Sequence, residues 1–474
     1  MELQSTPQLR VAVFATSLVQ FNGYSKVVYE LFKALIPRHK DIKIFHFGFQ
    51  QFYKNDQHRT DVPPEVECYD PWADETPKQA GFGVALVKGW VEKVRPDVCF
   101  VFNDMMVLHG VVNELKDSPL RSTFKVVIYI DQVYQFQKRD FINFMNMHAD
   151  AAVAFTPEWR DCIVKQGLTL PCDYLVHGFN PLTYYPIPRR LARRFFGMSG
   201  EDFLILNLNR NQPRKRWDTC LKAFAEVVHR LPDAPIKMVI GTDMKGGWDL
   251  MDVYERELAK RGVPINKGRE RLIIPGSPQQ MLDFDTNVLY NVADIGINTC
   301  DGEGFGLCNF EQAGLGIPQV VPRLGGFAHF FDDTRAAMVD PKVAIYVDSS
   351  RDGVGGEALL CDYSDFADRI IAYYKDAELR KRHGEASRRH ILQNFGWDKI
   401  ADRFSDIVRR AAPSKQPPPA AAAPAARGED AGITVAEAHR LLDEVGTKQV
   451  DTARIDELRA LRSRLDQLLC SASA

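Results

Sequence analysis

The sequence predicts an α/β protein with two doubly wound, Rossmann-like parallel sheets that face each other across a cleft. Short β-branched and aromatic runs alternate with amphipathic stretches of helical length, which is typical of βαβ units. The alternation restarts after a segment rich in Pro, Asn and Tyr at 178–188, which we interpret as an interdomain linker. We therefore expect ligands to bind where the carboxyl ends of the two sheets meet.

The first series of strands and helices predicts an N-terminal domain over residues 1–182. Its helix between the first two strands carries apolar residues at helical spacing from Val27 to Ile36 and is expected to end at Pro37. The candidate strands are Val11–Thr16, Ile42–Phe47, Val98–Phe102, Val126–Ile130, Ala151–Phe155 and Tyr174–Val176.

The second series predicts another domain over residues 183–410, whose last helices could return to the first domain. Helices are expected near Trp217–Leu231 and Leu250–Arg261. The candidate strands are Phe203–Leu208, Ile236–Ile240, Leu272–Ile274, Ile295–Thr299, Gln319–Val321 and Ala344–Val347.

The C-terminal part of the chain has a different composition. Residues 411–432 are rich in Pro and Ala and predict a semi-rigid linker. Residues 433–474 have a helical pattern, with Leu458, Leu461, Leu465 and Leu468 at 3/4 spacing. Because only about two heptads keep this register, a helical hairpin that packs on itself or on the body is favoured over a helix for self-association or partner binding.

Charge and cysteine content limit the possible classes of protein. The 60 Lys and Arg against 62 Asp and Glu give a net charge of −2, so no global positive field favours nucleic acid. The nine cysteines are widely spaced and several lie in apolar runs, which indicates small core residues in a reducing compartment. We expect no signal peptide and no membrane span, and hence a cytoplasmic protein.

A glycine-rich segment at 301–311 is the most informative motif. It follows a predicted strand and contains Gly302, Gly304 and Gly306, which allow a ligand to approach the main chain. A helix is expected from Leu307, with its free amides facing a phosphate. Glu303 in the loop and Glu311 in the helix offer carboxylates to the vicinal hydroxyls of a ribose or a hexose. The segment therefore suits both ends of a nucleotide sugar.

A second group of polar residues follows the strand Phe203–Leu208. It reads Asn209-Arg210-Asn211-Gln212-Pro213-Arg214-Lys215-Arg216. Arginine and lysine in a dry site can stabilise the charge that develops on a diphosphate leaving group. Within this run we expect Arg210 and Lys215 to stabilise the diphosphate. The alternative is that the run is a solvated basic loop.

Together these residues resemble a retaining glycosyltransferase of family 4, with the GT-B fold, from about Arg10 to Arg410. The resemblance rests on the E-x7-E element Glu303/Glu311 and its Gly-Phe-Gly core, on Arg210 and Lys215, and on three further stretches, 177–180, 290–294 and 325–326. It implies a hexosyltransferase that uses a UDP- or GDP-sugar and a glycan, glycoprotein or lipid-linked acceptor. It implies no metal or other cofactor for donor binding.

The resemblance also assigns roles to residues. Glu311 would bind the ribose hydroxyls, Glu303 the transferred sugar or its surroundings, and Arg210 and Lys215 the diphosphate. The main chain at Gly304, Phe305, Gly306 and Leu307 would add donors, and Thr242 and Ser277 would lie near the base.

Two positions depart from the family's pattern. One glycine, Gly23, stands where similar enzymes often have a Gly-Gly pair against the diphosphate. Asp131 ends a strand where many have a histidine facing the sugar, so we assign Asp131 to the binding of acceptor or sugar; a strand-terminal Asp that caps a turn is the alternative. Asn103-Asp104 is a similar candidate on the acceptor side.

The sequence excludes two other functions and leaves three alternatives open. The loop at 17–26 lacks G-x-G-x-x-G, and G-x-x-x-x-G-K-[ST] is absent, so an NAD-dependent oxidoreductase and a P-loop NTPase are excluded. A sugar phosphorylase, a nucleotide-sugar epimerase and a non-catalytic nucleotide-sugar-binding scaffold remain alternatives. Asp283-Phe284-Asp285 is expected at the surface of a helix rather than at a metal. Arg189–Arg194 is expected in a solvated helix, so membrane association is not favoured.

Overall fold

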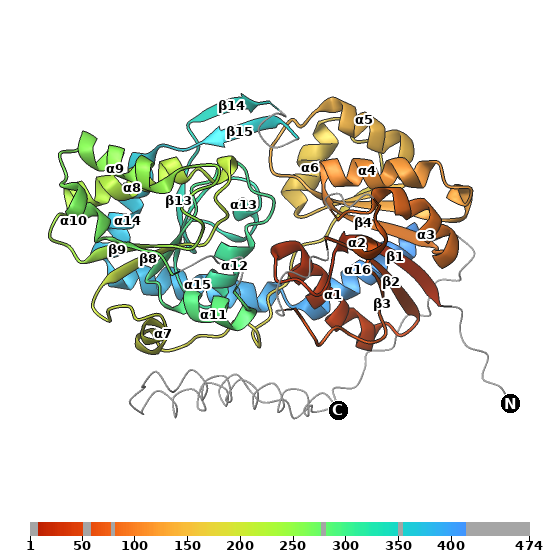
Figure 1. Cartoon of the computed structure of the whole chain (residues 1–474), viewed down its shortest axis with the longest axis horizontal. Helices are drawn as coiled ribbons and strands as arrows, with labels where there is room; N and C mark the ends of the chain where they lie inside the picture. Colours follow the sequence, from red (N-terminus) through yellow and green to blue (C-terminus); the bar gives the residue numbers. More distant parts are fainter. Residues whose placement is uncertain (1–7, 51–57, 77–80, 276–280, 349–353, 414–474) are drawn as a thin grey trace.

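The protein, seen in a computed structural model, has two parallel sheets side by side, each covered by helices on both faces (Figure 1). The structure describes residues 8–50, 58–76, 81–275, 281–348 and 354–413. The predicted Ser277, most of the predicted linker 411–432 and the whole predicted extension 433–474 lie outside these ranges. This architecture confirms the predicted α/β class with two doubly wound sheets.

The first sheet has the order β3-β2-β1-β4-β5-β6-β7, all parallel. Its strands are β1 (Leu9–Thr16), β2 (Ile42–Phe49), β3 (Glu67–Tyr69), β4 (Val98–Asp104), β5 (Lys125–Asp131), β6 (Ala151–Ala154) and β7 (Cys172–Tyr174). Its helices are α1 (Gly23–Arg38), α2 (Pro71–Asp74), α3 (Val87–Val94), α4 (Met105–Lys116), α5 (Arg139–His148) and α6 (Pro157–Lys165). We call this part the N-terminal half.

The second sheet has the order β10-β9-β8-β11-β12-β13, again all parallel. Its strands are β8 (Phe203–Asn207), β9 (Ile236–Ile240), β10 (Leu272–Ile273), β11 (Ile295–Ile297), β12 (Gln319–Pro322) and β13 (Ala337–Val339). Its helices are α7 (Arg189–Phe195), α8 (Trp217–Arg230), α9 (Leu250–Lys260), α10 (Ile265–Arg269), α11 (Asp283–Asn291), α12 (Leu307–Gly314), α13 (Phe327–Phe330), α14 (Tyr363–Lys375) and α15 (Ala377–Asn394). We call this part the C-terminal half.

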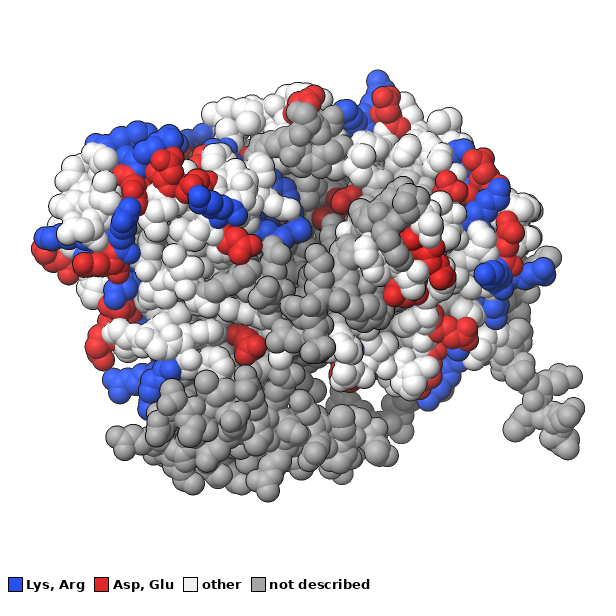
Figure 2. Space-filling view, in the orientation of Figure 1, with Lys and Arg blue, Asp and Glu red and all other residues white. Residues whose placement is uncertain are grey.

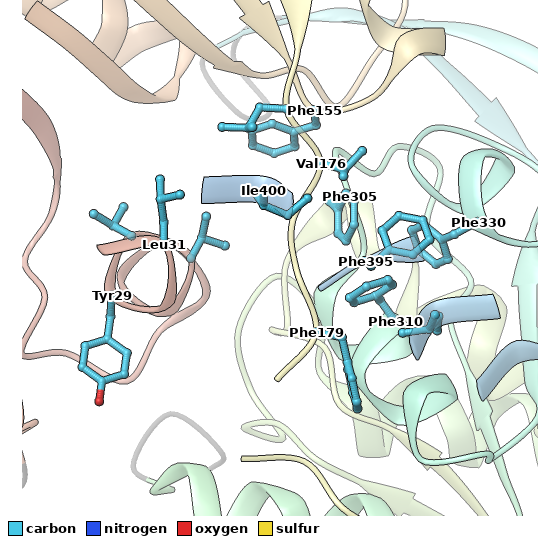
Figure 3. Packing of buried hydrophobic residues seen from close by; sticks show 14 of the residues in the cluster. Tyr29, Leu31, Phe155, Val176, Phe179, Phe305, Phe310, Phe330, Phe395 and Ile400 are labelled. Atoms are coloured by element: carbon cyan, nitrogen blue, oxygen red, sulfur yellow. The ribbon is translucent and has the colours of Figure 1, made fainter. Parts of the chain in front are cut away.

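The central strands are apolar on both faces because helices cover both faces of each sheet. In β1, Val11 and Val13 belong to one core cluster and Ala12 and Phe14 to another on the opposite face. The first of these clusters continues into the C-terminal half, where Phe305, Phe310, Phe330 and Phe395 pack together (Figure 3). One continuous apolar cluster therefore joins the two halves.

The last described helix, α16 (Trp397–Ala411), packs on the N-terminal half beside α1, β4 and β5 (Figure 1). Arg409 pairs with Asp41 at 2.7 Å and Arg403 with Asp173 at 2.5 Å. The chain thus crosses between the halves twice, near residue 179 and again near residue 395, where the Phe179 N–H donates to the Phe395 carbonyl at 2.7 Å.

Several local expectations were wrong. The strand expected at Tyr174–Val176 is Cys172–Tyr174, and α1 continues through Pro37 to Arg38. The strand expected at Ala344–Val347 is present as β14 (Val343–Val347), but it does not continue the second sheet. It pairs antiparallel with β15 (Gly356–Leu360) in a hairpin outside both parallel sheets.

Two charged segments and one cysteine also differ from expectation. Arg193 of α7 is buried, and its guanidinium binds Asp294 at 2.7 Å, so this helix is not solvated all round. Asp283 is mostly buried between basic side chains rather than on the surface. Cys68 is exposed, whereas Cys99, Cys220 and Cys300 are buried as expected.

No helix within the described ranges combines the length and the apolar character that a membrane crossing requires.

Candidate active site

The carboxyl ends of the two sheets meet at the glycine-rich loop between β11 and α12. The indole N–H of Trp159, from the N-terminal half, donates to the Gly304 carbonyl at 2.9 Å. A β-carbon at Gly304 would overlap the Asp131 carboxylate, and one at Gly23 would lie 3.3 Å from the Leu307 side chain. The first turns of α1 and α12 and the end of β5 therefore converge at this loop.

Local sequence explains why the loop has this shape. Gly306 has φ +93°, in the left-handed region, and a side chain there would also collide with Phe327. Gly306 is the N-cap of α12 and supplies no side-chain hydrogen bond to the first turn. The Phe305 side chain is buried against His177, Phe310 and Phe330, so only its main chain is available to a ligand.

Glu303 is buried and paired with two cations from the loop after β8. The Lys215 ammonium binds its Oε2, and the Arg214 guanidinium lies 3.6 Å from its Oε1. Burial alone would raise the pKa of Glu303, but Lys215 and Arg214 together bring it below its ordinary value. Glu303 is therefore an ionised carboxylate held between two basic side chains.

A network of buried amides lies behind Glu303. Asn298, just after β11, donates from Nδ2 to Asn209 at 3.2 Å and to Asn309 at 3.1 Å, and lies 3.4 Å from Glu303 Oε2. Asn309 in turn donates to Gln319 at 2.8 Å. Because buried polar groups that satisfy one another have one preferred arrangement, this network fixes the positions of the loops that carry the charges.

Asp131 faces Glu303 from the N-terminal half. The hydroxyl of Tyr24, in the first turn of α1, donates to Asp131 Oδ2 at 2.5 Å. Burial raises the pKa of Asp131, and the nearby Arg214 guanidinium offsets this only in part. Burial also raises the pKa of Asp104, which pairs with Asp131 across β4 and β5 and caps α4. The environment thus shifts the pKa values of the two facing carboxyls in opposite directions: the pKa of Glu303 is lowered and that of Asp131 is raised.

Glu311, in the second turn of α12, has its own set of partners. The Lys26 ammonium of α1 lies 3.0 and 3.2 Å from its two oxygens, and the Tyr290 hydroxyl donates to Oε2 at 2.8 Å. Burial raises the pKa of Glu311, although Lys26 acts in the opposite direction. Lys26 in turn lies 3.8 Å from Asp283, which also binds Arg59.

The remaining predicted residues are placed as follows. Arg210 is exposed in the loop after β8, and its charge lowers the pKa of Asp104 against the effect of burial. Thr242 is buried just after β9, at the carboxyl edge of the second sheet. The structure brings Glu303, Lys215 and Asp131 together, whereas Arg210 forms no ion pair with another described residue.

Sequence reasoning missed three residues of this site, namely Arg214, Lys26 and Trp159. Arg214 belongs to the basic run after β8, but the order of residues in a short loop does not show which cation is buried. Lys26 lies three residues after the selected Gly23, and no local signal linked it to Glu311. Trp159 follows β6 at the start of α6, and no motif in the sequence singled it out.

Charges of opposite sign gather where the halves meet. In Figure 2, blue side chains of the half on the left face red side chains of the half on the right, near the middle of the view. Within the described part of the chain, no group of three or more His, Cys, Asp or Glu side chains has the arrangement of a metal site. The site thus combines an ionised Glu303, a protonatable Asp131, two buried cations and the free amides of α12.

Comparisons with known proteins match parts of this chain to glycosyltransferases. Residues 285–404 match the model of "Family 4 Glycosyltransferase in conflict systems". The D-inositol 3-phosphate glycosyltransferase of Rhodococcus jostii is 25% identical over 266 residues, which cover 56% of this chain and 53% of that protein. The corresponding protein of Corynebacterium diphtheriae is 24% identical and covers 56% of this chain and 57% of its own length. The chain thus spans about half the length of the curated relatives that it matches.

Solved structures share the fold. HepE from Anabaena, determined with UDP and glucose, superimposes with a TM-score of 0.63 at 14% identity, covering 85% of this chain and 100% of that one. Sucrose-phosphate synthase from Thermosynechococcus elongatus gives a TM-score of 0.62 at 16% identity, covering 85% and 99%. WaaG, a glycosyltransferase of lipopolysaccharide biosynthesis, gives 0.58 at 15% identity, covering 84% and 99%.

Proposed function

We propose that this chain, a family 4-like protein of the GT-B fold, is a retaining glycosyltransferase that transfers a hexose from a nucleoside-diphosphate sugar to an acceptor hydroxyl. One observation carries the proposal. Glu303, paired with Lys215 and Arg214, lies at the carboxyl end of one sheet directly opposite Asp131 at the end of the other.

The donor is proposed to bind along the first turns of α12. Glu311 accepts hydrogen bonds from the ribose, and the amides of Phe305, Gly306 and Leu307 face the sugar and the diphosphate. Gly23 leaves room for the diphosphate against the first turn of α1, and Thr242 lies toward the base. UDP and GDP are the nucleotides we propose. Donor binding is proposed to use protein groups alone, without a metal or other cofactor.

The buried cations are proposed to stabilise the leaving group. As the bond between the anomeric carbon and the phosphate oxygen breaks, negative charge develops on the diphosphate, and Lys215 and Arg214 are already fixed beside it. Arg210 adds a further positive charge from its exposed position. Because Lys215 and Arg214 are already held by their ion pairs with Glu303, little reorganisation of these two side chains is required during the reaction.

Retention follows from attack on the face that the phosphate leaves. The acceptor oxygen forms the new bond to the anomeric carbon, and the acceptor proton passes to the departing phosphate oxygen, so no protein nucleophile is needed. Glu303 stabilises the cationic character of the sugar. Asp131, whose pKa is raised, orients an acceptor or sugar hydroxyl by hydrogen bonding.

The acceptor is proposed to be a glycan, a glycoprotein or a lipid-linked sugar in the cytoplasm. A phosphorylated polyol should also be tested as an acceptor, because the relatives from Rhodococcus and Corynebacterium are named for D-inositol 3-phosphate.

The test is proton NMR of the protein with UDP-, GDP- and ADP-sugars, first without acceptor and then with inositol 3-phosphate or an oligosaccharide. We expect slow hydrolysis of one donor by the wild type, with the retained anomer appearing first, and none by Glu303→Ala. Transfer should follow when the right acceptor is present. Consumption of a sugar phosphate only with inorganic phosphate would instead indicate a phosphorylase. Binding of a nucleotide sugar without turnover under any condition would indicate a scaffold.

A further inference from the structure

A buried lysine of the N-terminal half, Lys26, binds the carboxylate of Glu311, which is the group proposed to bind the ribose. Lys26 lies in the first turn of α1, and its ammonium lies 3.0 and 3.2 Å from the oxygens of Glu311 in α12. The two side chains are 13% and 4% exposed. The proposed reaction assigns no role to Lys26, although this pair directly connects the two halves.

The surroundings of the pair are mostly acidic or phenolic. The groups that face Lys26 and Glu311 come from four elements and are Tyr290 and Asp283 of α11, Cys308 of α12, Tyr184 of the crossing segment and Arg59 before β3. Arg59 is bound to Asp283, so it does not contact Glu311. Lys26 is therefore the cation that directly contacts the Glu311 carboxylate among the described residues.

The pair leaves capacity for a ligand. A carboxylate can accept about four hydrogen bonds. Lys26 contacts both oxygens and Tyr290 contacts Oε2, which leaves a position on Oε1. A ribose hydroxyl can therefore donate to Glu311 without displacing Lys26.

We propose that Lys26 is a positioning residue for the nucleotide, which keeps the Glu311 carboxylate ionised and fixed so that it can accept the ribose hydroxyl. This inference rests on the proposed function of Glu311. It adds that the N-terminal half, through α1, determines whether the nucleotide-binding carboxylate of the C-terminal half is competent. Nucleotide binding thereby depends on the approach of α1 to α12.

Loss of the lysine has a defined electrostatic consequence. Burial already raises the pKa of Glu311, and Asp283 acts in the same direction. Without Lys26 the pKa of Glu311 rises further, and a protonated carboxyl has lost acceptor capacity. Nucleotide affinity should then depend on pH, improving as pH rises and the carboxyl ionises.

The experiment measures binding of UDP, GDP and ADP by calorimetry at several values between about pH 6 and pH 8.5. Lys26→Met should weaken nucleotide binding about tenfold or more at the lowest pH. The loss of affinity relative to wild type should become smaller as the pH rises. The reason is that each pH unit below the pKa of Glu311 lowers the ionised fraction of its carboxyl about tenfold. Lys26→Arg should restore wild-type behaviour. Ratios to wild type cancel the titration of the nucleotide phosphates.

A matched control lies on the same helix. Lys33→Met removes a lysine that pairs with Asp61 at 3.2 Å on the more exposed side of α1, and it should leave nucleotide affinity unchanged. Lys26→Gln, neutral but able to donate, serves if Lys26→Met does not fold, with the same pH dependence expected. Unchanged affinity in the neutral variants, or a deficit that is constant with pH and not rescued by arginine, would overturn the proposal.

A second measurement separates this inference from the proposed function. Because a raised folded-state pKa of Glu311 means that the folded protein binds the extra proton, stability is lost as pH rises above the ordinary carboxyl range. The stability deficit of Lys26→Met relative to wild type should thus grow with rising pH in urea unfolding. Wild type that binds none of the three nucleotides would count against the proposed function, whereas a deficit independent of pH would overturn the role of Lys26 in ionising Glu311.

Discussion

Trp159 and Gly304 are joined by a hydrogen bond from the indole N–H to the carbonyl oxygen at 2.9 Å, and this bond connects the two halves at the glycine-rich loop. On the other side of Gly304, the space that a side chain would need is filled by the Asp131 carboxylate. The loop therefore tolerates no added atom between the two sheets, and the distance between Glu303 and Asp131 depends on that contact.

Gly304→Ala should separate these elements. The new methyl group overlaps Asp131, and overpacking of this kind costs about 1–3 kcal/mol. We expect urea unfolding to show this loss of stability. Transferase activity should fall as well, because the movement displaces Asp131 from Glu303. Gly89→Ala in α3 is the control, because its methyl group meets nothing within 4 Å and should stabilise the helix. Full activity in Gly304→Ala would contradict the close contact between Gly304 and Asp131.

Glu311→Ala should weaken donor binding about ten- to a hundredfold, because a hydrogen bond to a charged group contributes about 1.5–3 kcal/mol. Calorimetry with the donor nucleotide measures this. Glu255→Ala, which loses only a surface ion pair with Arg269, should bind as wild type does. Unchanged affinity in a folded Glu311→Ala protein would remove Glu311 from the site.

Lys215→Ala should reduce kcat more than it raises KM, since the ammonium acts mainly on charge that develops in the transition state. The variant also leaves Glu303 with Arg214 as its remaining cationic contact, so thermal unfolding should occur at a lower temperature. Arg210→Ala, at an exposed position, should show a smaller loss of kcat. A change confined to KM would assign Lys215 to ground-state binding.

Two buried histidines should make the protein less stable in mild acid. Burial lowers the pKa of His177 to about 3 and that of His46 to about 4, whereas the unfolded chain titrates near 6.5. A lowered folded-state pKa means that the unfolded state binds the proton first, so stability present above about pH 6.5 is lost as pH falls. At about pH 5.5 each histidine should lower the free energy of unfolding by about 1.4 kcal/mol relative to its value well above pH 6.5.

Urea unfolding between about pH 7.5 and pH 5.5 measures this dependence. His177 packs against Phe155 and Phe305, so a phenylalanine fits its surroundings. His177→Phe should therefore reduce the dependence of the free energy of unfolding on pH by the contribution of one histidine. An unchanged slope would mean that His177 takes up its proton in the folded protein as readily as in the unfolded chain.

The sequence predicted much of the fold because the signals were local. Apolar runs with helical stretches between them gave five of the first strands close to their observed bounds and gave β9 without error. The errors have local causes as well. The strand β3 contains no β-branched residue and was not predicted, and β13 was not predicted either. The strand β14 was predicted, but its antiparallel pairing with β15 could not be inferred from the sequence. The domain boundaries at 182 and 410 stay a prediction.

The site was predicted in part for the same reason. Glu303 and Glu311 lie at the end of a strand and in the following helix, so their spacing and the three glycines were visible together. Asp283 was misplaced because a charged residue in or beside a helix is usually exposed, whereas here Lys26 and Arg59 approach it from distant segments. Arg214 was overlooked beside Lys215 because burial within a loop depends on what packs against it.

The sequence by itself determined the class of fold, the glycine-rich loop and the carboxylates and cations at the ends of neighbouring strands, because these depend on short-range periodicity and on conformational freedom at single residues. Only the tertiary structure decided which charges meet. The pairing of Lys26 with Glu311 and the contact of Asp131 with Gly304 join residues far apart in the chain, and their energies depend on distance and burial. Those two quantities exist only once the halves have packed together.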